Sequence, residues 1–392
     1  MKFNKWKLYI KNWKSYLQLF VDSYFNILAL YVGKLLPINK RKVYVSNFEG
    51  LGFGCNPKAI VLSLHSLDPS LLIVWQVKEY SLEFPKWIKQ VRILSFMSYI
   101  HMATSHIWID NYRKPIYINK RKEQYYMQTW HGYNGLKKAE GDSIDVLSIE
   151  YVKVAKHDSN MINLFLSNGK FFTDTIRRAF WYNGEVLESG SPRCDILYKT
   201  GSNNYSIHEF YGIDKDVSII LYAPTFRKNW VNVYNIDFKR IVCAFQERFE
   251  KKCVVLFRLH PGIRNLNYAS NIESVIDVSL YPDMYELMAE SDYFISDYSS
   301  TLFEFAGTYK PTFIYASDVD SYINDRGFHF DLNNLPIPVC RNNDELISNI
   351  LKYDYKYSRE AIRQFMERVG ICETKQASNI VAKKIVEICH TK

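Results

Sequence analysis

Short apolar runs alternate with helix-like segments along most of the chain. Strand-like runs occupy positions 43–48, 71–77 and 106–109, and positions 57–67 have the spacing of a helix. This alternation is typical of βαβ units and predicts a parallel sheet. No internal repeat or low-complexity segment is evident.

A second series of the same kind begins near Val217. Strands are expected at 217–222, 254–259, 293–296 and 312–315, and helices at 238–249, 284–290 and 377–389. The polar stretch 199–205 (KTGSNNY) is the best linker candidate. We therefore predict two α/β domains, 39–203 and 204–392. Ligands of open parallel sheets bind beyond the carboxyl ends of the strands, so both halves are expected to direct loops to one crevice.

The first 38 residues form a separate segment that is basic and aromatic. On a helical wheel Lys7, Lys11 and Lys14 lie opposite an apolar face. That face consists of Phe3, Trp6, Tyr9, Ile10, Trp13, Tyr16, Leu17, Phe20 and Tyr24. A helix of this kind suits the headgroup region of an anionic membrane, and the apolar run 25–32 is too short to span a bilayer.

Two other interpretations of this segment remain. A signal peptide also has a basic start, but aromatic residues begin at once here and no small-residue cleavage site follows. A helix packed on the protein's own surface, or on a partner, stays open. We expect the segment 1–38 to attach the protein peripherally to a membrane.

Composition narrows the classes of partner. The chain has 392 residues, 47% hydrophobic and 23% charged, which fits two globular domains. Its net charge of +9 favours an anionic partner: nucleic acid, a membrane or a phosphorylated substrate. The seven cysteines are dispersed without a C-x-x-C pair, which indicates reduced thiols rather than zinc ligands or disulfides.

The familiar cofactor motifs are missing from the sequence. The glycines of 50–54 lack the Lys-Ser/Thr pair of a phosphate-binding loop, and no GxGxxG motif occurs. Asp318 and Asp320 have D-x-D spacing, but no His or Cys is nearby. We therefore expect no metal site and no bound cofactor.

The stretch 128–138 (QTWHGYNGLKK) carries the first candidate for chemistry. His131 precedes a glycine at the end of an apolar run, so it is expected on an exposed tight turn. Histidine accepts a proton near neutral pH, which makes His131 a candidate general base. Lys137 and Lys138 would add positive charge. A purely structural histidine in a turn fits this stretch equally well when it is taken alone.

The stretch 257–261 (FRLHP) carries the second candidate for chemistry. Pro261 ends the predicted strand, so His260 is expected at its carboxyl end, and Arg258 lies two residues earlier on the same face. An arginine beside a histidine forms a clamp for an oxyanion or a phosphate. The pair could instead hold a structural carboxylate.

Two further stretches supply hydroxyls after strands. After the predicted strand 293–296 and Asp297 come three hydroxyl residues, Ser299, Ser300 and Thr301. They stand at the start of a predicted helix, and the start of a helix is a favourable place to bind phosphate. Glu304 lies three residues after Thr301, as in a capping box.

The stretch 221–227 (LYAPTFR) is weaker and adds Thr225 and Arg227. Across the three C-terminal stretches, 221–227, 257–261 and 297–301, the cations are separated by turns and do not line a helix. This pattern favours a nucleotide diphosphate over nucleic acid.

Taken in order, these stretches resemble the CDP-glycerol glycerophosphotransferase family, the primases and polymerases of teichoic acids and related capsules. The resemblance covers residues 43–385. Its matching stretches are 48–60, 128–138, 191–195 (SPRCD), 221–227, 257–261, 277–306 and 326–331 (RGFHFD). The sequence departs from the family pattern at Tyr133 and Asn134, where Thr-Pro is usual, and at Cys194, where Asn is common.

The resemblance implies a GT-B-like fold of two facing Rossmann-like domains. It implies that CDP-glycerol or a related CDP-polyol binds the C-terminal half, and that His131 and His260 are the catalytic histidines. Gly132, Asn134, Lys137 and Lys138 would then lie on the acceptor side. It also implies peripheral attachment to the cytoplasmic face of the bacterial membrane, where polyprenyl-diphosphate-linked acceptors are found.

The reaction expected from these residues and this resemblance is transfer of a polyol phosphate, with CMP as leaving group. His131 would act as base and His260 with Arg258 would stabilise charge, while Ser299, Ser300 and Thr301 would hold the diphosphate. Glycosyl transfer from a nucleotide sugar is the alternative enzymatic hypothesis, and a membrane-bound scaffold without activity is the non-enzymatic one. The polyol, the number of units added and the oligomeric state stay open.

Overall fold

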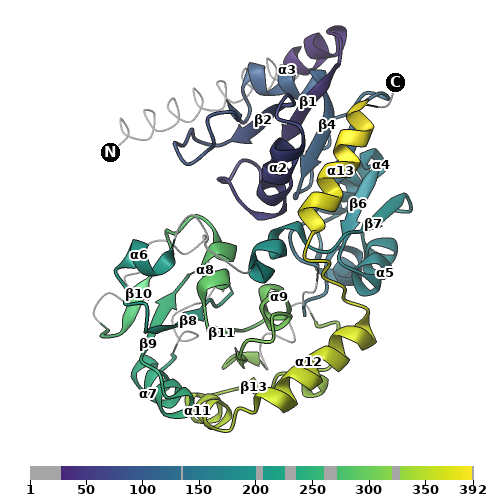
Figure 1. Ribbon diagram of the computed structural model, residues 1–392. Coiled ribbons are helices and arrows are strands. Elements are labelled where there is room, and N and C mark those ends of the chain that lie inside the picture. Colours follow the sequence, from purple (N-terminus) through teal and green to yellow (C-terminus); the bar gives the residue numbers. More distant parts are fainter. Residues whose placement is uncertain are drawn as a thin grey trace, which may run out of the picture. The chain divides into compact units, whose positions relative to one another are not determined.

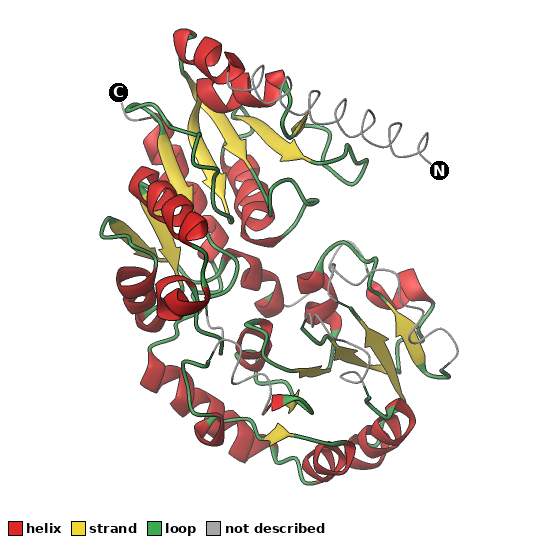
Figure 2. Cartoon of the chain, turned by 180° about the vertical axis from the view of Figure 1, so that it is seen from behind, coloured by secondary structure: helices red, strands yellow, loops and turns green. Residues whose placement is uncertain are grey.

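The computed structural model describes residues 28–133, 136–199, 206–225, 235–259, 272–319 and 327–390. Two parallel β-sheets dominate this part of the chain, each accompanied by helices (Figures 1 and 2). The two parallel sheets predicted from the alternating pattern are therefore confirmed. None of the helices in the described ranges is both long and apolar enough to cross a bilayer.

The first sheet has the strand order β3-β2-β1-β4-β5-β6-β7. Its strands are β1 (Asn39–Val45), β2 (Leu72–Val77), β3 (Lys89–Arg92), β4 (Ser105–Asp110), β5 (Tyr125–Gln128), β6 (Leu164–Ser167) and β7 (Glu185–Glu188). The helical segments along this part of the chain are α2 (Cys55–Leu67), α3 (Phe96–Thr104), η1 (Glu140–Val146), α4 (Ile149–Met161), α5 (Lys170–Ala179) and η2 (Pro192–Tyr198).

The second sheet has the order β10-β9-β8-β11-β12-β13. Its strands are β8 (Ser218–Tyr222), β9 (Cys253–Phe257), β10 (Val275–Asp277), β11 (Tyr293–Ser296), β12 (Thr312–Tyr315) and β13 (Val339–Cys340). The helical segments here are α6 (Ile207–Tyr211), α7 (Phe238–Phe249), α8 (Met284–Glu290), α9 (Thr301–Ala306), η4 (Leu332–Asn334), α11 (Asn343–Leu351), α12 (Tyr355–Val369) and α13 (Ala377–His390).

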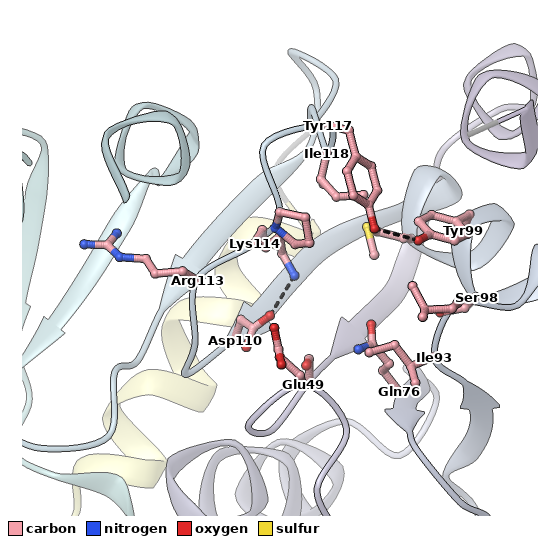
Figure 3. A pocket seen from close by; sticks show the side chains of 14 residues that line it. Glu49, Gln76, Ile93, Ser98, Tyr99, Asp110, Arg113, Lys114, Tyr117 and Ile118 are labelled. Carbon is pink, nitrogen blue, oxygen red and sulfur yellow. Dashed lines mark hydrogen bonds and ion pairs between the residues drawn. The ribbon is translucent and has the colours of Figure 1, made fainter. Parts of the chain in front are cut away.

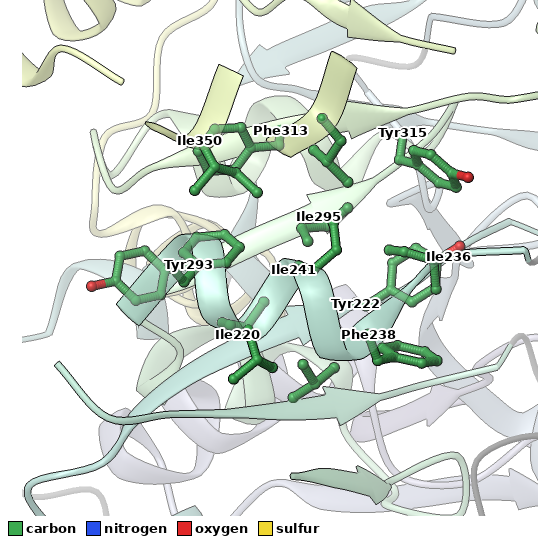
Figure 4. Packing of buried hydrophobic residues seen from close by; sticks show 14 of the residues in the cluster. Ile220, Tyr222, Ile236, Phe238, Ile241, Tyr293, Ile295, Phe313, Tyr315 and Ile350 are labelled. Carbon is green, nitrogen blue, oxygen red and sulfur yellow. The ribbon is translucent and has the colours of Figure 1, made fainter. Parts of the chain in front are cut away.

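Both faces of the second sheet are buried, which explains its continuous apolar strands. In β8, Ile220 and Tyr222 join a cluster with residues of α7 and α11 (Figure 4). Ile219 and Leu221, which alternate with them, join a second cluster with residues of α6 and α8. Successive side chains of a strand point to opposite faces, so a run without polar residues is what a sheet covered on both sides requires.

The chain divides into two compact units. The first unit comprises the described parts of Met1–Trp130, Lys153–Phe165 and Asn379–Lys392, and the second comprises those of His131–Val152 and Leu166–Ser378. Most of α13 thus groups with the first unit, although the sequence assigned the terminal helix to the second domain. Its end carries His390, which pairs with Asp68 of the first unit at 3.4 Å. The predicted boundary at 203/204 stays a prediction, because residues 200–205 lie outside the described ranges.

Most predicted elements of the second series match the structure closely, whereas the first predicted strand does not. The structure ends β1 at Val45 and not at position 48, because Phe48 and Glu49 have positive φ angles of 42° and 56°. Such angles belong to a turn and are incompatible with a strand. Residues 1–27 lie outside the described ranges, so the amphipathic helix stays a prediction.

Candidate active site

The strand order of the second sheet reverses between β8 and β11, and hydrogen bonds join the loops that follow these two strands. Asp297, after β11, accepts bonds from the backbone N–H of Thr225, 3.0 Å from both carboxylate oxygens, and from its Oγ1 at 3.0 Å. Ser296 Oγ donates to the carbonyl of Ala223 at 2.8 Å. A switch point of this kind is where parallel sheets bind ligands.

Asp297 therefore has a defined structural partner. Its side chain is 2% exposed and also accepts from the backbone N–H of Tyr298 at 2.6 Å. A carboxylate repels phosphate, so the physical role that these bonds support is to hold Thr225 in place. Phosphate contacts by Thr225 or Asp297 stay a prediction.

Residues 299–301 form a tight turn that leads into α9, and the side chains of Ser299 and Thr301 bond to each other there. Ser299 Oγ accepts from the Thr301 N–H at 3.3 Å and from Thr301 Oγ1 at 2.8 Å. The capping box predicted for Thr301 and Glu304 was wrong. The residue before the helix is Ser300, which makes no side-chain cap, and Glu304 is buried in contact with other groups. An ion pair satisfies that buried carboxylate better than a backbone cap would.

His131 follows a turn that the sequence predicted correctly at the end of β5. Trp130 has a positive φ of 47°, rare for a bulky residue, and its N–H donates to Gln128 Oε1 at 2.9 Å. Asn56 Nδ2 donates to the carbonyls of Thr129 and Trp130, both at 3.1 Å. His131 itself is half-buried. The turn is thus fixed by specific bonds immediately before the histidine.

An arginine outside the predicted site residues holds His131 from the other side. Arg193 Nη1 donates to the His131 carbonyl at 2.9 Å, and its Nη2 pairs with Glu304 of α9 at 2.6 Å. The side chains of Arg193 and Glu304 are 5% and 0% exposed. The Tyr285 hydroxyl donates to the second Glu304 oxygen, and the Tyr285 ring lies 4.9 Å from the guanidinium. A buried ion pair therefore connects His131 to α9.

Gly132 lies directly against the hydroxyl turn. A Cβ atom placed on Gly132 would be 3.3 Å from Ser300 Oγ, closer than most side chains approach each other. The structure thus brings together two sets of residues that the sequence assigned to different sides, the acceptor side and the phosphate side. All of these atoms belong to the second unit.

The segment 191–195, which carries Arg193, is fixed at both ends. Glu373 accepts from the Ser191 N–H at 2.8 Å, from its Oγ at 2.7 Å, and from Asn168 Nδ2 at 3.0 Å. Burial raises the pKa of Glu373 to about 7. Asp195 accepts from the N–H groups of Ala377 and Ser378. These bonds explain how a short loop can keep an arginine in one position.

The two candidate lysines, 137 and 138, lie on a strip that pairs with residues 327–329. Lys137 forms an antiparallel bridge with Phe328, and His329 N–H donates to the Leu136 carbonyl at 2.7 Å. The side chain of His329 is 9% exposed, and its Nδ1 lies 3.9 Å from Asp142. Burial lowers the pKa of His329. The strip places a second histidine next to the segment that carries His131.

Arg258 is engaged by the protein's own backbone. Its Nη1 donates to the carbonyls of Tyr281, at 2.6 Å, and Val278, at 3.3 Å. The residue lies just after β9, which ends at Phe257 and not at the predicted position 259. The clamp of Arg258 with His260 stays a prediction, because His260 lies outside the described residues, as do Arg227 and Asn134.

Two departures from the family pattern turn out to be core residues. Tyr133 is 1% exposed and its ring packs 4.8 Å from that of Phe172. Cys194 is 1% exposed, and burial raises the pKa of its thiol. Both side chains therefore belong to the packed interior.

Within the second unit, the described residues thus combine three features. They are His131 held by Arg193, the hydroxyl turn 299–301, and the bonded pair of Thr225 and Asp297 at the switch point. These groups suit attack by a hydroxyl on a phosphate ester, with His131 taking the proton. Among the described residues no group of three or more His, Cys, Asp or Glu side chains is placed to hold a metal ion.

Comparison with known sequences places this chain among transferases. Residues 29–387 match the family described as CDP-Glycerol:Poly(glycerophosphate) glycerophosphotransferase. The teichoic acid poly(glycerol phosphate) polymerase of Bacillus spizizenii is 30% identical over 370 residues, covering 90% of this chain and 93% of the relative. The teichoic acid glycerol-phosphate transferase of Staphylococcus aureus is 29% identical over 367 residues, covering 88% and 93%.

Comparison with solved structures shows which fold the chain shares. The wall teichoic acid polymerase TagF superposes with a TM-score of 0.82 at 24% identity, covering 97% of this chain and 98% of that one. The GT-B-like α/β fold expected from the sequence is thereby confirmed.

Proposed function

This chain belongs to the CDP-glycerol:poly(glycerophosphate) glycerophosphotransferase family, and from that premise we propose that it transfers glycerol phosphate from CDP-glycerol to a hydroxyl of a teichoic acid precursor. The relatives are named for building poly(glycerol phosphate) or for adding glycerol phosphate. The acceptor we propose is a lipid-linked precursor or the growing polymer. CMP is the second product.

In the proposed reaction an acceptor hydroxyl attacks the β-phosphorus of CDP-glycerol. A new P–O bond forms to the acceptor, and the bond between the β-phosphorus and the bridging oxygen breaks. That oxygen keeps the electron pair and leaves as part of CMP. The hydroxyl proton goes to the imidazole of His131. No other reactant is needed, and catalysis rests on positioning and electrostatics.

The observation that carries this proposal is the junction of Gly132 with Ser300. It supports a site in which the base and the phosphate-binding hydroxyls act on one substrate. Arg193 and Glu304 position the base through the His131 carbonyl. Thr225 and the turn 299–301 are proposed to contact the diphosphate. His260 and Arg227 are proposed on the same side from the sequence alone.

A panel of donors tests the reaction class. The protein is incubated with a lipid-linked acceptor and CDP-glycerol, CDP-ribitol or a UDP-sugar, and the released nucleotide is measured. We expect CMP from CDP-glycerol. Release of UDP from the sugar donor, with none from either CDP-alcohol, would support glycosyl transfer instead. CMP from CDP-ribitol alone would keep the reaction and change the polyol.

We also propose peripheral attachment to the cytoplasmic face of the membrane through residues 1–38. The support is the sequence pattern, in which lysines oppose an aromatic face. Cosedimentation with vesicles tests it: binding to anionic vesicles should exceed binding to zwitterionic ones. Replacing Lys7, Lys11 and Lys14 with glutamate should abolish the difference. Equal binding of both proteins to both vesicle types would contradict the proposal.

A further inference from the structure

A cavity opens in the first unit at the point where the order of the first sheet reverses. It lies beside the carboxyl ends of β1, β2 and β4, next to α3, and its lining includes Ser46. Gln76 and Asp110 of the lining are labelled in Figure 3. In the second sheet, the equivalent reversal between β8 and β11 carries Thr225 and Asp297. Because ligands of parallel sheets bind at such reversals, each sheet has its own candidate ligand position.

The cavity has a deep polar floor and a more open rim. Ser46, Ser98 and Asp110 are at most 4% exposed, whereas Tyr117 at the rim is 39% exposed. The hydroxyls of Tyr99 and Tyr117 lie 3.0 Å apart. The volume is about 50 Å³, roughly the room of three to five water molecules. A three-carbon polyol or one edge of a sugar ring fits that space.

Both cations on the cavity wall are already paired with carboxylates, and the third carboxylate there, Glu49, adds negative charge. Lys114 Nζ pairs with Asp110 at 2.7 Å, and both side chains are buried. Arg113 pairs with Asp158 at 3.1 Å, and its guanidinium points away from the cavity (Figure 3). An anion would have to compete with these carboxylates. An uncharged ligand would meet hydroxyl, amide and carboxylate groups at no such cost.

One buried polar atom on the floor is left without a partner by the protein. Ser46 Oγ has no hydrogen-bond partner among the described residues, although the side chain is 1% exposed. Its backbone N–H is bonded to Ile109, so the residue itself is held in place. Buried hydroxyls in native proteins are normally satisfied, and an exception at the floor of a cavity indicates a bond to a bound molecule.

We propose that this cavity binds an uncharged polyhydroxyl group, a glycerol or a sugar unit, in addition to the nucleotide substrate. Ser46 Oγ, the Ser98 hydroxyl and the Gln76 amide would bond its hydroxyls. The source of that group in the cell, a polyol or the sugar of an acceptor, rests on the proposed function. The binding itself does not.

Saturation-transfer NMR on the full chain tests the site with glycerol, ribitol and glucose as separate probes, and inorganic phosphate is used as a competitor. We expect at least one neutral probe to bind and phosphate not to displace it. Ser46→Ala should weaken that binding roughly 2- to 10-fold, the loss of one neutral hydrogen bond. Tyr117→Phe, at the rim, should weaken it as well. Which probe binds distinguishes a polyol source from a sugar source.

Stability measurements separate binding from misfolding. Since the Ser46 hydroxyl makes no bond within the described chain, Ser46→Ala should leave the unfolding midpoint unchanged or raise it. Ser66→Ala, on the exposed side of α2, is the matched control and should bind like wild type.

Equal binding by Ser46→Ala and wild type would overturn the proposal, as would no binding by a chain that turns over CDP-glycerol. Binding by a chain without turnover would instead contradict the proposed function alone.

Discussion

Replacing Glu304 with glutamine is the sharpest perturbation of the site that avoids the reacting groups. The change keeps the shape of the side chain and removes the charge that pairs with Arg193 at 2.6 Å. Both side chains are buried, so the guanidinium would be left in the interior without its counter-charge. A single glutamine oxygen would also have to serve both Arg193 and Tyr285.

The expected loss of stability is large. Breaking a buried pair by removing one partner typically costs about 3–5 kcal/mol, a substantial part of the total stability of a domain. An Arg193 side chain without its counter-charge would also shift, and with it the His131 carbonyl, which Arg193 holds at 2.9 Å. A shift of about 1 Å at a catalytic group lowers the rate by about 100-fold.

A double variant separates these two effects. In Arg193→Met with Glu304→Leu, apolar side chains replace the whole pair, and such replacements restore or increase stability. The donor to the His131 carbonyl is still missing. The Tyr285 hydroxyl also loses its acceptor, so we expect a stability loss of about 1–3 kcal/mol in urea unfolding, smaller than in Glu304→Gln, together with kcat reduced by roughly 10- to 100-fold. Glu360→Gln, which breaks an exposed pair with Arg363, is the control and should change neither quantity.

The outcome that would refute this reasoning is a double variant with wild-type kcat. The pair would then contribute only to folding, and His131 would have to be positioned by the bonds before it in the chain. A single Glu304→Gln variant with unchanged stability would show that the pair is not buried as described.

Three further perturbations follow from contacts in the structure. Gly132→Ala should lower kcat at least several-fold with little loss of stability, because its Cβ would lie 3.3 Å from Ser300 Oγ and displace that hydroxyl; normal turnover would place the hydroxyl outside the reaction. Asp297→Asn should raise the KM for CDP-glycerol roughly tenfold, since Thr225 loses a charged acceptor; a change in kcat alone would contradict its role in binding. Burial raises the pKa of Glu373 from 4.5 to about 7, so its contribution to the free energy of unfolding is complete below about pH 4.5 and is lost as the pH rises to about 7. The stability of wild type relative to Glu373→Gln should therefore fall across that range by up to about 3 kcal/mol in urea unfolding, and parallel pH profiles would contradict the raised pKa.

The strands of the second sheet were predictable because burial on both faces leaves continuous apolar runs. The predicted bounds of β11 and β12 agree with the structure for this reason. The turn at His131 was predictable from a glycine that follows an apolar run. β1 was placed too far along the chain, since the apolar character of Phe48 does not reveal its positive φ.

The pairing of Arg193 with Glu304 was not predictable from spacing, because more than a hundred residues separate the two in the chain. A signal was nevertheless present. Glu304 is the one charge within the otherwise apolar α9 sequence TLFEFA, and a buried carboxylate requires a partner. Its spacing from Thr301 indicated a local cap instead. Local motifs are visible in a sequence, whereas the partner of a buried charge emerges only from the fold.

The unsatisfied Ser46 hydroxyl is likewise a feature that only the fold reveals. Nothing in the stretch 43–48 distinguishes this serine from any polar residue that ends a strand. Its meaning depends on what surrounds it, namely the balanced charges of Asp110 and Lys114 and the space beside them.

The proposed attack at phosphorus is tested most directly by the fate of the β-phosphate. CDP-glycerol labelled at that phosphate is incubated with acceptor and either wild-type protein or His131→Ala. We expect the label in the acceptor and unlabelled CMP in solution, with the rate lower in the variant by about 10²- to 10⁴-fold while its fold is retained. Label released as CDP, or a variant as fast as wild type, would contradict the mechanism.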